Sequence, residues 1–220
     1  MDFYVIVPGH NEEKNIGDVI RKAKKFVAAS NIIVVDDGSR DGTAETARES
    51  GITVLRHVIN LGKGAALRTG SQYSCSKGAE ALVFMDSDGQ HDPEDLPRLL
   101  EALKDSDIVF TFRERKSENM PMVKKIGNNI IDVLMSVLFH IKVQDTQCGY
   151  KAMTRQAYEK LQLMSNDYSI ESEIVAKAGK YKLKFTQLPI KTIYADRYKG
   201  TTVFDGIKIV LKMLWWKAAR

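Results

Sequence analysis

The segment IIVVDDGSRDGT, residues 32–43, sets the pattern for the first half of the chain. A run of β-branched apolar residues changes abruptly to acidic, glycine and hydroxyl residues. The same change occurs in FYVIVPGHNEE (3–13) and in ALVFMDSDGQH (81–91). Short apolar runs bounded by turn-forming residues predict buried strands that end in polar turns.

These runs alternate with helical patterns along the first half. We expect strands at residues 3–7, 32–35, 52–55, 81–85 and 107–112, and helices at 13–28, 41–49, 63–76 and 93–103. Asp92 and Pro93 are typical of an N-cap and a first helical position. Alternation at this spacing predicts right-handed crossovers, so we expect a mostly parallel sheet between two helical layers.

The second half is less regular. We expect helices at 119–140 and 169–178, one or two strands within 183–194, and an apolar, lysine-containing helix at 204–216. No repeat or flexible linker interrupts the chain. The sequence therefore predicts one domain over residues 1–220, with a regular first part (1–110), a less regular second part (111–202) and a C-terminal amphipathic helix (203–220).

Composition excludes several classes of protein. With 44% apolar and 28% charged residues in 220, disorder is excluded, and two cysteines exclude a disulfide scaffold or a structural zinc site. We interpret Cys148 as a small buried residue. No apolar run reaches about 18 residues and no signal peptide opens the chain, so we expect a globular protein on the cytosolic side, without a nucleic-acid partner.

Charge is divided unevenly along the chain. The net charge is +5, but residues 1–110 hold 13 basic and 18 acidic residues, against 20 and 10 in residues 111–220. This division either reflects chance and solvated helix faces, or separates an acidic half that holds a cation from a basic half that meets phosphates or an anionic surface.

Polar clusters follow the expected strands at residues 7–12, 35–43 and 85–91, and Gly62-Lys63-Gly64 precedes a helix. In a parallel sheet, ligands bind outside the carboxyl ends of the strands, so these clusters are expected to share one site. Each cluster alone is also compatible with ordinary turn chemistry. Gly62-Lys63-Gly64 fits neither a dinucleotide-binding fingerprint, because Leu67 replaces the third small residue, nor a Walker A loop.

Asp86 and Asp88 are the most informative pair. Two carboxylates that converge repel each other unless a cation lies between them, and oxygen ligands favour Mg²⁺ or Mn²⁺ over zinc. The alternative is a pair of exposed loop acids.

These motifs together resemble the inverting family 2 glycosyltransferases of the GT-A fold, over nearly the whole chain. The matching residues are Pro8, Asn11 and Glu12, the segment 36–43, Gly62-Lys63-Gly64, and Asp86-x-Asp88-x-Gln90. Within that family, DTQCGYK (145–151) looks like the motif of the dolichyl- and polyprenyl-phosphate sugar transferases.

The resemblance implies a site and a reaction, with residues 1–110 as the nucleotide and metal half and residues 111–202 as the acceptor half. It implies a nucleotide-sugar contact surface formed by Pro8, Asn11, Glu12, Asp37, Lys63 and Asp86, with Mg²⁺ or Mn²⁺ held by Asp86 and Asp88. Gln90 would orient the sugar or the metal shell. The implied activity is hexose transfer from UDP-glucose or GDP-mannose to a polyprenyl or dolichyl phosphate at the cytoplasmic membrane face.

The acceptor admits alternatives. A lipid phosphate needs cations, and Arg113, Arg115 and Arg197 are candidates; a saccharide hydroxyl needs a carboxylate base, and Glu171 or Glu173 are candidates. At most one of these two glutamates should face the site. A soluble saccharide transferase and a non-catalytic nucleotide-sugar-binding module therefore stay open. The family motif Arg-x-x-Gly-x-Ser-Lys appears as residues 197–203 without its final basic residue.

The helix at 204–216 is too short for a hydrocarbon core of about 30 Å. Phe204, Ile207, Val210, Leu211 and Leu214 share one broad face. Trp215-Trp216 and Lys217 suit a headgroup interface. We expect this helix to lie in the plane of an anionic membrane, as a peripheral anchor; the alternative is a helix that packs its apolar face on the domain.

Overall fold

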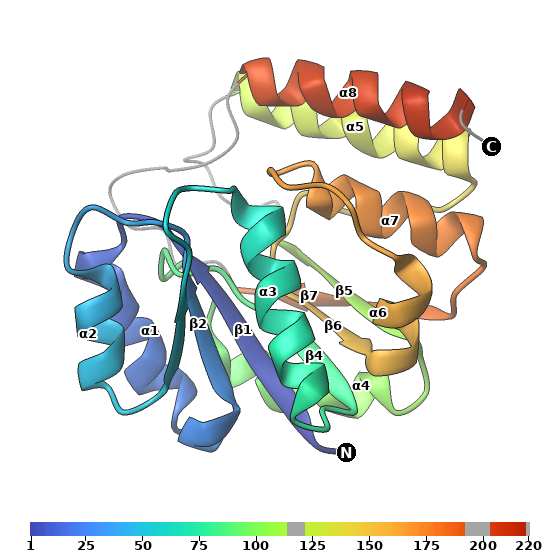
Figure 1. The fold of residues 1–220 in the computed structure, drawn as a ribbon. Helices are drawn as coiled ribbons and strands as arrows, with labels where there is room; N and C mark the ends of the chain where they lie inside the picture. Colours follow the sequence, from blue (N-terminus) through green and yellow to red (C-terminus); the bar gives the residue numbers. More distant parts are fainter. Residues whose placement is uncertain (114–121, 192–202, 219–220) are drawn as a thin grey trace.

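A computed structural model describes residues 1–113, 122–191 and 203–218. A seven-stranded sheet forms its centre, with helices on both faces (Figure 1). The strands are β1 (Phe3–Gly9), β2 (Ile32–Asp36), β3 (Thr53–Arg56), β4 (Ala81–Phe84), β5 (Ile108–Arg113), β6 (Lys151–Thr154) and β7 (Phe185–Ile190). This architecture confirms the predicted α/β fold.

The strand order is β3-β2-β1-β4-β6-β5-β7. All neighbours are parallel except at β6, which runs antiparallel to both β4 and β5. Lys151, the first residue of β6, is paired with Phe84 and with Phe110, near the ends of β4 and β5. The beginning of β6 therefore lies at the same edge of the sheet as the carboxyl ends of the parallel strands.

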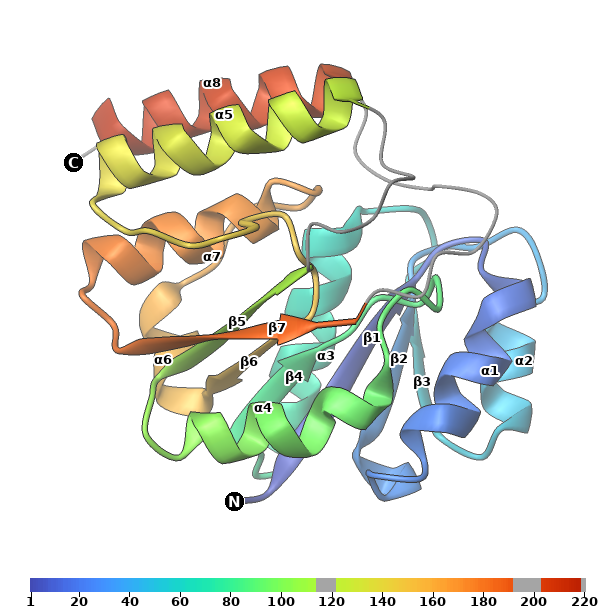
Figure 2. The same cartoon turned by 180° about the vertical axis from the view of Figure 1, so that it is seen from behind.

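Helices α1 (Glu13–Ala23), α2 (Thr43–Glu49) and α4 (Leu96–Leu103) cover one face of the sheet (Figure 2). Helices α3 (Lys63–Ser76), α6 (Arg155–Leu161) and α7 (Ile170–Lys180) cover the other face. Two apolar cores result: one joins α1 and α4 to the sheet, and one joins α3 and α5–α8 to it. Burial of both sheet faces explains why the strands read as continuous apolar runs.

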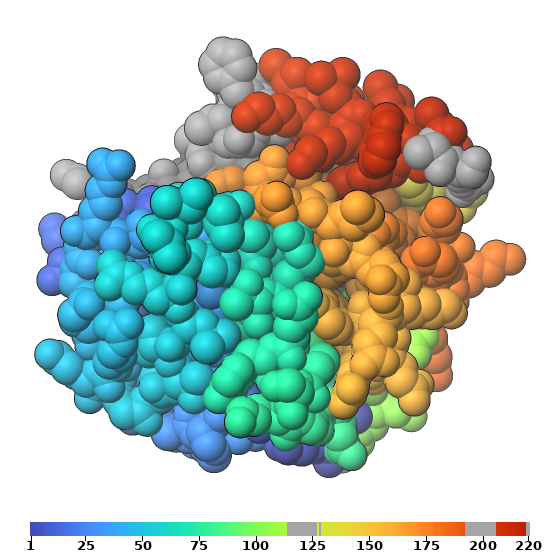
Figure 3. Space-filling view, in the orientation of Figure 1, coloured from blue at the N-terminus to red at the C-terminus, as the bar shows by residue number. Residues whose placement is uncertain are grey.

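Helices α5 (Met122–Phe139) and α8 (Val203–Ala218) lie side by side, and both contact α7 (Figures 1 and 2). In α8 the buried residues are Ile209 and Met213, whereas Ile207, Leu211 and Leu214 of the expected apolar face are exposed. The helix, red in the space-filling view of Figure 3, therefore packs one apolar line on the protein and exposes a second one. It packs on the domain, as the alternative expected, but through other residues than the predicted face, and its membrane orientation stays a prediction.

Several boundaries differ from expectation. Helix α1 ends at Ala23 rather than at residue 28, and residues 24–26 form a turn. Val27 beyond the turn is still buried in the same core, so the apolar spacing alone does not mark the end of the helix. The helix expected at 93–103 begins with a 3₁₀ turn, Pro93–Asp95, which Asp92 caps as predicted by accepting from the Glu94 amide. Strand β6 and helix α6 were not expected. A second short 3₁₀ turn, Ala29–Asn31, precedes β2.

Candidate active site

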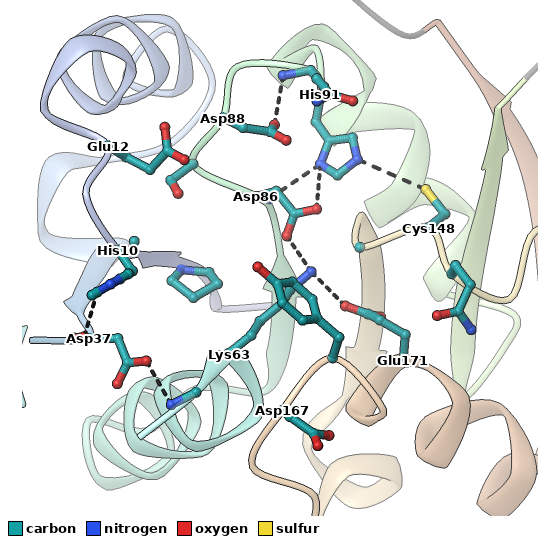
Figure 4. A pocket seen from close by; sticks show the side chains of 18 of the residues that line it. His10, Glu12, Asp37, Lys63, Asp86, Asp88, His91, Cys148, Asp167 and Glu171 are labelled. Carbon is teal, nitrogen blue, oxygen red and sulfur yellow. Dashed lines mark hydrogen bonds and ion pairs between the residues drawn. The ribbon is translucent and has the colours of Figure 1, made fainter. Parts of the chain in front are cut away.

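A pocket of ≈ 640 Å³ opens at the edge of the sheet where the parallel strands end (Figure 4). Apart from the two candidate bases Glu171 and Glu173, which are described below, every predicted site residue that the structure describes lines this pocket: Pro8, Asn11, Glu12, Asp37, Lys63, Asp86, Asp88, Gln90 and Arg113. Arg115 and Arg197 lie outside the described residues. The fold therefore brings together side chains from five separate segments, and their individual roles stay predictions.

Asn11 joins the turn after β1 to the turn after β2. Its backbone amide donates to the Ser39 Oγ, and its side-chain oxygen accepts from the Arg40 amide, both over 2.9 Å. Its φ of 55° lies in the left-handed region, which asparagine tolerates better than most residues. The adjacent Glu12 is buried at the pocket wall, and Asn15 donates to its carboxylate. These contacts fix the rim beside β1.

Asp37 holds the loop that leads into α3. Its carboxylate accepts hydrogen bonds from the amides of Leu61 (2.9 Å) and Gly62 (2.7 Å). The ring of His57 lies 2.7 Å from the same carboxylate and 2.9 Å from the Thr69 hydroxyl. Gly62 has a φ of 97°, and a Cβ there would overlap the Asn166 carbonyl. Asp37 therefore shapes the pocket wall as well as lining it.

Asp86 and Asp88 follow β4 and titrate in opposite directions. Burial works against the charged form of Asp86, but the Lys63 ammonium outweighs it and lowers the pKa of Asp86 to about 2. Burial and the neighbouring Asp86 charge raise the pKa of Asp88 to about 6. Its Oδ1 accepts from the Gln90 amide over 3.0 Å. The charge of Asp88 is thus incompletely balanced by the protein itself.

Lys63 bridges the two halves of the chain. Its ammonium lies 2.5 Å from Asp86 Oδ1 and 2.8 Å from Glu171 Oε1. The other oxygen of Glu171 accepts from Lys151, which also donates to the Cys148 carbonyl. Burial opposes the charge of Lys63, yet Asp86 and Glu171 raise its pKa. A row of alternating charges, Asp86–Lys63–Glu171–Lys151, therefore crosses the pocket floor.

His91 closes the buried end of the pocket behind Asp86. Its ring stacks on Tyr150 with centroids 5.1 Å apart, and its Nδ1 accepts from the Asp86 amide over 3.3 Å. Burial lowers the pKa of His91 to about 4, so the ring is neutral at pH 7, as this acceptor role requires. Cys148 is buried beside it, and burial raises the pKa of its thiol to about 11. This agrees with the interpretation of Cys148 as an inert, small buried residue.

The segment 145–151 enters the pocket because β6 runs opposite to its neighbours. Asp145 forms a two-point ion pair with Arg113, through Nε (2.6 Å) and one terminal nitrogen (2.9 Å). Thr146 donates to Asp132 of α5. At Gly149, a Cβ would overlap the Asp86 carboxylate, so only glycine allows this approach.

The two candidate bases separate as predicted. Glu171 faces the pocket, whereas Glu173 turns away and accepts from the amides of Met164 and Ser165. Lys177 also pairs with Glu173 over 2.7 Å. Both carboxylates are buried and ion-paired, which lowers their value as proton acceptors.

Sequence reasoning missed part of the pocket. Asn60, Gln147, Asp167 and Tyr168 also line it. Asp167 precedes α7 and binds Lys212 of α8, whose ammonium lies 2.9 and 3.0 Å from the two carboxylate oxygens. For Asp167 and Tyr168 the sequence signal is the polar cluster at 165–169, which is also typical of an ordinary turn. Gln147 lies in the segment 145–151 that carries the resemblance, but no role follows from the motif alone.

The pocket suits a hard divalent cation that takes one or two ligands from the protein and the others from phosphate oxygens and water. In the described part of the chain, no three His, Cys, Asp or Glu side chains cluster as a complete metal site. Asp86 and Asp88 nevertheless repel each other at the pocket surface, and Mg²⁺ or Mn²⁺ binds through one or two carboxylates plus phosphate oxygens and water. The residues present therefore fit a metal that is shared with a phosphate ligand.

Comparisons with known proteins show which family the chain matches. The sequence model described as glycosyl transferase family 2 matches residues 4–162. The UDP-N-acetylglucosamine–dolichyl-phosphate N-acetylglucosaminyltransferase of Methanococcus voltae is 31% identical, over 99% of this chain and 96% of its own. The dolichol-phosphate mannosyltransferase of Pyrococcus furiosus is 30% identical, over 99% of this chain and 65% of its own.

Among solved structures, glucosyl-3-phosphoglycerate synthase from Mycobacterium tuberculosis, in complex with Mn²⁺, UDP-glucose and phosphoglyceric acid, has a TM-score of 0.78. The two sequences are 20% identical, over 99% of this chain and 80% of the other. At this identity the likeness concerns the fold.

Proposed function

Because this chain belongs to glycosyl transferase family 2, we propose that it moves a hexose from a nucleoside-diphosphate sugar to a polyprenyl or dolichyl phosphate. The glycosyltransferase class follows from the family match. The lipid-phosphate acceptor is supported by the names of relatives that are about as long as this chain. UDP-glucose and GDP-mannose are the sugar donors that we propose to test first.

The observation that carries the acceptor assignment is the pairing of charges beside β5 and β6. A phosphate acceptor arrives already ionised, so the enzyme must supply a fixed cation rather than a base. Arg113 lines the pocket, and Asp145 orients its guanidinium through two contacts. The saccharide alternative needs a free carboxylate base, but Glu171 is clamped between two lysines.

On the opposite wall, Pro8, Glu12 and Asp37 would hold the nucleotide, and Lys63 stands beside the expected diphosphate. Asp86 and Asp88 would hold Mg²⁺ or Mn²⁺, with Gln90 next to them. When bound, the metal would neutralise the diphosphate leaving group. The carboxylates of Asp86, Asp88 and Glu12 would repel a diphosphate at this wall until a divalent cation binds.

We also propose peripheral attachment to an anionic membrane on its cytoplasmic side. Within the described ranges, no helix is long and apolar enough to cross a bilayer. Instead α5 and α8 present a shared outward surface, here called the α5–α8 face. Its exposed apolar residues are Ile130, Val133, Val137, Ile207, Leu211, Leu214 and Trp215. Amphipathic helices with such a surface and nearby lysines lie in the headgroup region.

The experiment that tests the function pairs acceptors that differ by one group. Purified protein with Mn²⁺ is incubated with UDP- and GDP-hexoses and either a short polyprenyl phosphate, the corresponding polyprenol or a free saccharide. We expect a product only with the lipid phosphate, because only this acceptor is ionised and matches Arg113. Asp88→Asn should be inactive, and Asp18→Asn on the exposed face of α1 should be fully active.

Transfer to the saccharide, with none to the lipid phosphate, would instead support the soluble saccharide transferase. Tight binding of a nucleotide sugar with no transfer to any acceptor would support the non-catalytic module.

A further inference from the structure

Asp86 already has a cation within bonding distance. The Lys63 ammonium lies 2.5 Å from Asp86 Oδ1, and both side chains are at least half-buried. The second carboxylate oxygen is hemmed in by Gly149, where no Cβ fits, and by the neutral His91 ring 3.9 Å away. Lys63 therefore occupies the accessible side of the Asp86 carboxylate.

A divalent cation held by Asp86 would share this carboxylate with the ammonium, and like charges at one partly buried carboxylate repel each other strongly. The two cations therefore compete for Asp86: either the lysine retreats, or the metal binds weakly.

The lysine has a second partner to retreat to. Its ammonium is 2.8 Å from Glu171, and Glu171 is itself held in place by Lys151 at the start of β6. A small rotation of the lysine side chain would lengthen the contact to Asp86 and keep the contact to Glu171. Glu171 thus acts as a fixed anchor rather than as a proton acceptor.

We propose that Lys63 is a displaceable counter-ion of Asp86, which a divalent cation must push towards Glu171 before it can bind. This inference rests on the metal site of the proposed function and adds that Lys63 must move away before the metal binds. Free metal alone should bind weakly, because it must displace Lys63 without help. Metal that arrives with a diphosphate gains the phosphate oxygens as further ligands, so the site favours the metal–nucleotide complex over the bare ion.

The test measures Mn²⁺ binding directly, by the loss of the paramagnetic resonance signal of free Mn²⁺, without any sugar donor. We expect Lys63→Gln to bind Mn²⁺ about tenfold more tightly than the wild type, the effect of losing one charge-assisted competitor. Lys63→Arg, which keeps the charge, should stay close to the wild type. Glu171→Gln should bind Mn²⁺ about threefold more weakly, because Lys63 then has Asp86 as its remaining anionic partner in this row.

A double-mutant cycle separates competition from a general change in charge. If Glu171 acts through Lys63, Glu171→Gln should have no effect in the Lys63→Gln background. Lys177→Gln is the control for Lys63→Gln, because it also removes one positive charge but from α7, where Lys177 pairs with Glu173 away from the pocket. Thermal melting of each variant shows whether it folds; if Lys63→Gln does not fold, Lys63→Met takes its place in the same cycle.

Equal Mn²⁺ affinity in the wild type and Lys63→Gln would overturn this inference and leave the metal site intact. The inference is also overturned if Glu171→Gln weakens Mn²⁺ binding equally in both backgrounds. If no variant binds Mn²⁺ even when UDP is added, the metal site of the proposed function fails, and the inference fails with it.

Discussion

The two walls of the pocket hold their polar residues in different ways. The proposed sugar-donor wall, here called the sugar-donor wall, is formed by the ends of β1, β2 and β4, and hydrogen bonds between neighbouring turns fix it, such as those of Asn11 to Ser39 and Arg40. The proposed acceptor wall, here called the acceptor wall, is formed by β5, the 145–151 segment and α7, and partly buried ion pairs such as Arg113–Asp145 fix it. Lys63 pairs with both walls.

This contrast suits two different ligands. A nucleotide is recognised by shape and by hydrogen bonds, which require a rigid wall. Turns that are linked by hydrogen bonds from backbone amides provide such a wall. A lipid phosphate presents mainly charge, and a guanidinium held by a carboxylate recognises it with fixed geometry. If the contrast is functional, variants of the two walls must fail at different steps.

The largest effect is expected on the sugar-donor wall. Asp88→Asn removes a proposed metal ligand but keeps the shape of the loop, so turnover should fall at least about 10³-fold, with the melting temperature preserved. Excess EDTA should have the same effect on the wild type. Full activity in EDTA would break the assignment of Asp86 and Asp88 as metal ligands.

The next effect sharpens the contrast on the acceptor wall. Arg113→Ala removes one charge-assisted phosphate contact, worth about 1.5–3 kcal/mol, so KM for the lipid phosphate should rise about 10- to 100-fold. Donor affinity, measured by calorimetry with UDP and Mn²⁺, should not change. A rise in the KM for the sugar donor alone would contradict the assignment of Arg113 to the acceptor.

A smaller effect is expected at the α5–α8 face. Leu211 is 62% exposed, and Leu211→Ser should weaken binding to anionic liposomes about tenfold with little change in stability. Met213→Ser is the matched comparison on the buried side of the same helix, and it should mainly destabilise the fold, by roughly 2–5 kcal/mol. Equal liposome binding by the wild type and Leu211→Ser would remove the membrane role of this face.

Truncation before α8 is a poorer experiment, because it also deletes Ile209 and Met213 from the core.

The smallest effect concerns the link between this face and the pocket. Lys212→Gln breaks a partly exposed pair with Asp167, so stability should fall by no more than about 1 kcal/mol. Burial opposes the charge of Asp167, but bonds from Ser169 and Lys212 lower its pKa. A depressed carboxyl pKa stabilises the fold above the unfolded value of about 4 and ceases to do so as the pH falls through the folded value. Urea titrations at pH 7 and pH 3 should therefore differ less for Lys212→Gln than for the wild type.

The sugar-donor wall could be predicted from sequence because its determinants are local. Each of its residues follows a strongly apolar strand, and the carboxyl ends of parallel strands share an edge by topology. The Asp92 cap and the separation of Glu171 from Glu173 also follow from neighbours in the sequence.

The acceptor wall depends on contacts between residues that are distant in the sequence, and no local sequence pattern predicts such contacts. Strand β6 has only the residues KAMT, and its lysine is buried because Glu171, far along the chain, neutralises it. The sequence also did not predict which face of α8 is buried, the one with Ile209 and Met213. Ile207, Leu211 and Leu214 form an equally regular apolar face. Tertiary contacts decide which of two equivalent faces packs.

The antiparallel insertion of β6 has a consequence for biosynthesis. Strand β4 pairs on one side with β1, which precedes it in the chain, but its other edge pairs with residues 151–154, which are made much later. A nascent chain that has left the ribosome only as far as β5 therefore carries an open, apolar strand edge, the kind that recruits other chains. Expression of residues 1–110 as a stand-alone nucleotide-binding fragment would preserve that exposed edge permanently, and aggregation rather than ligand binding would be its main property.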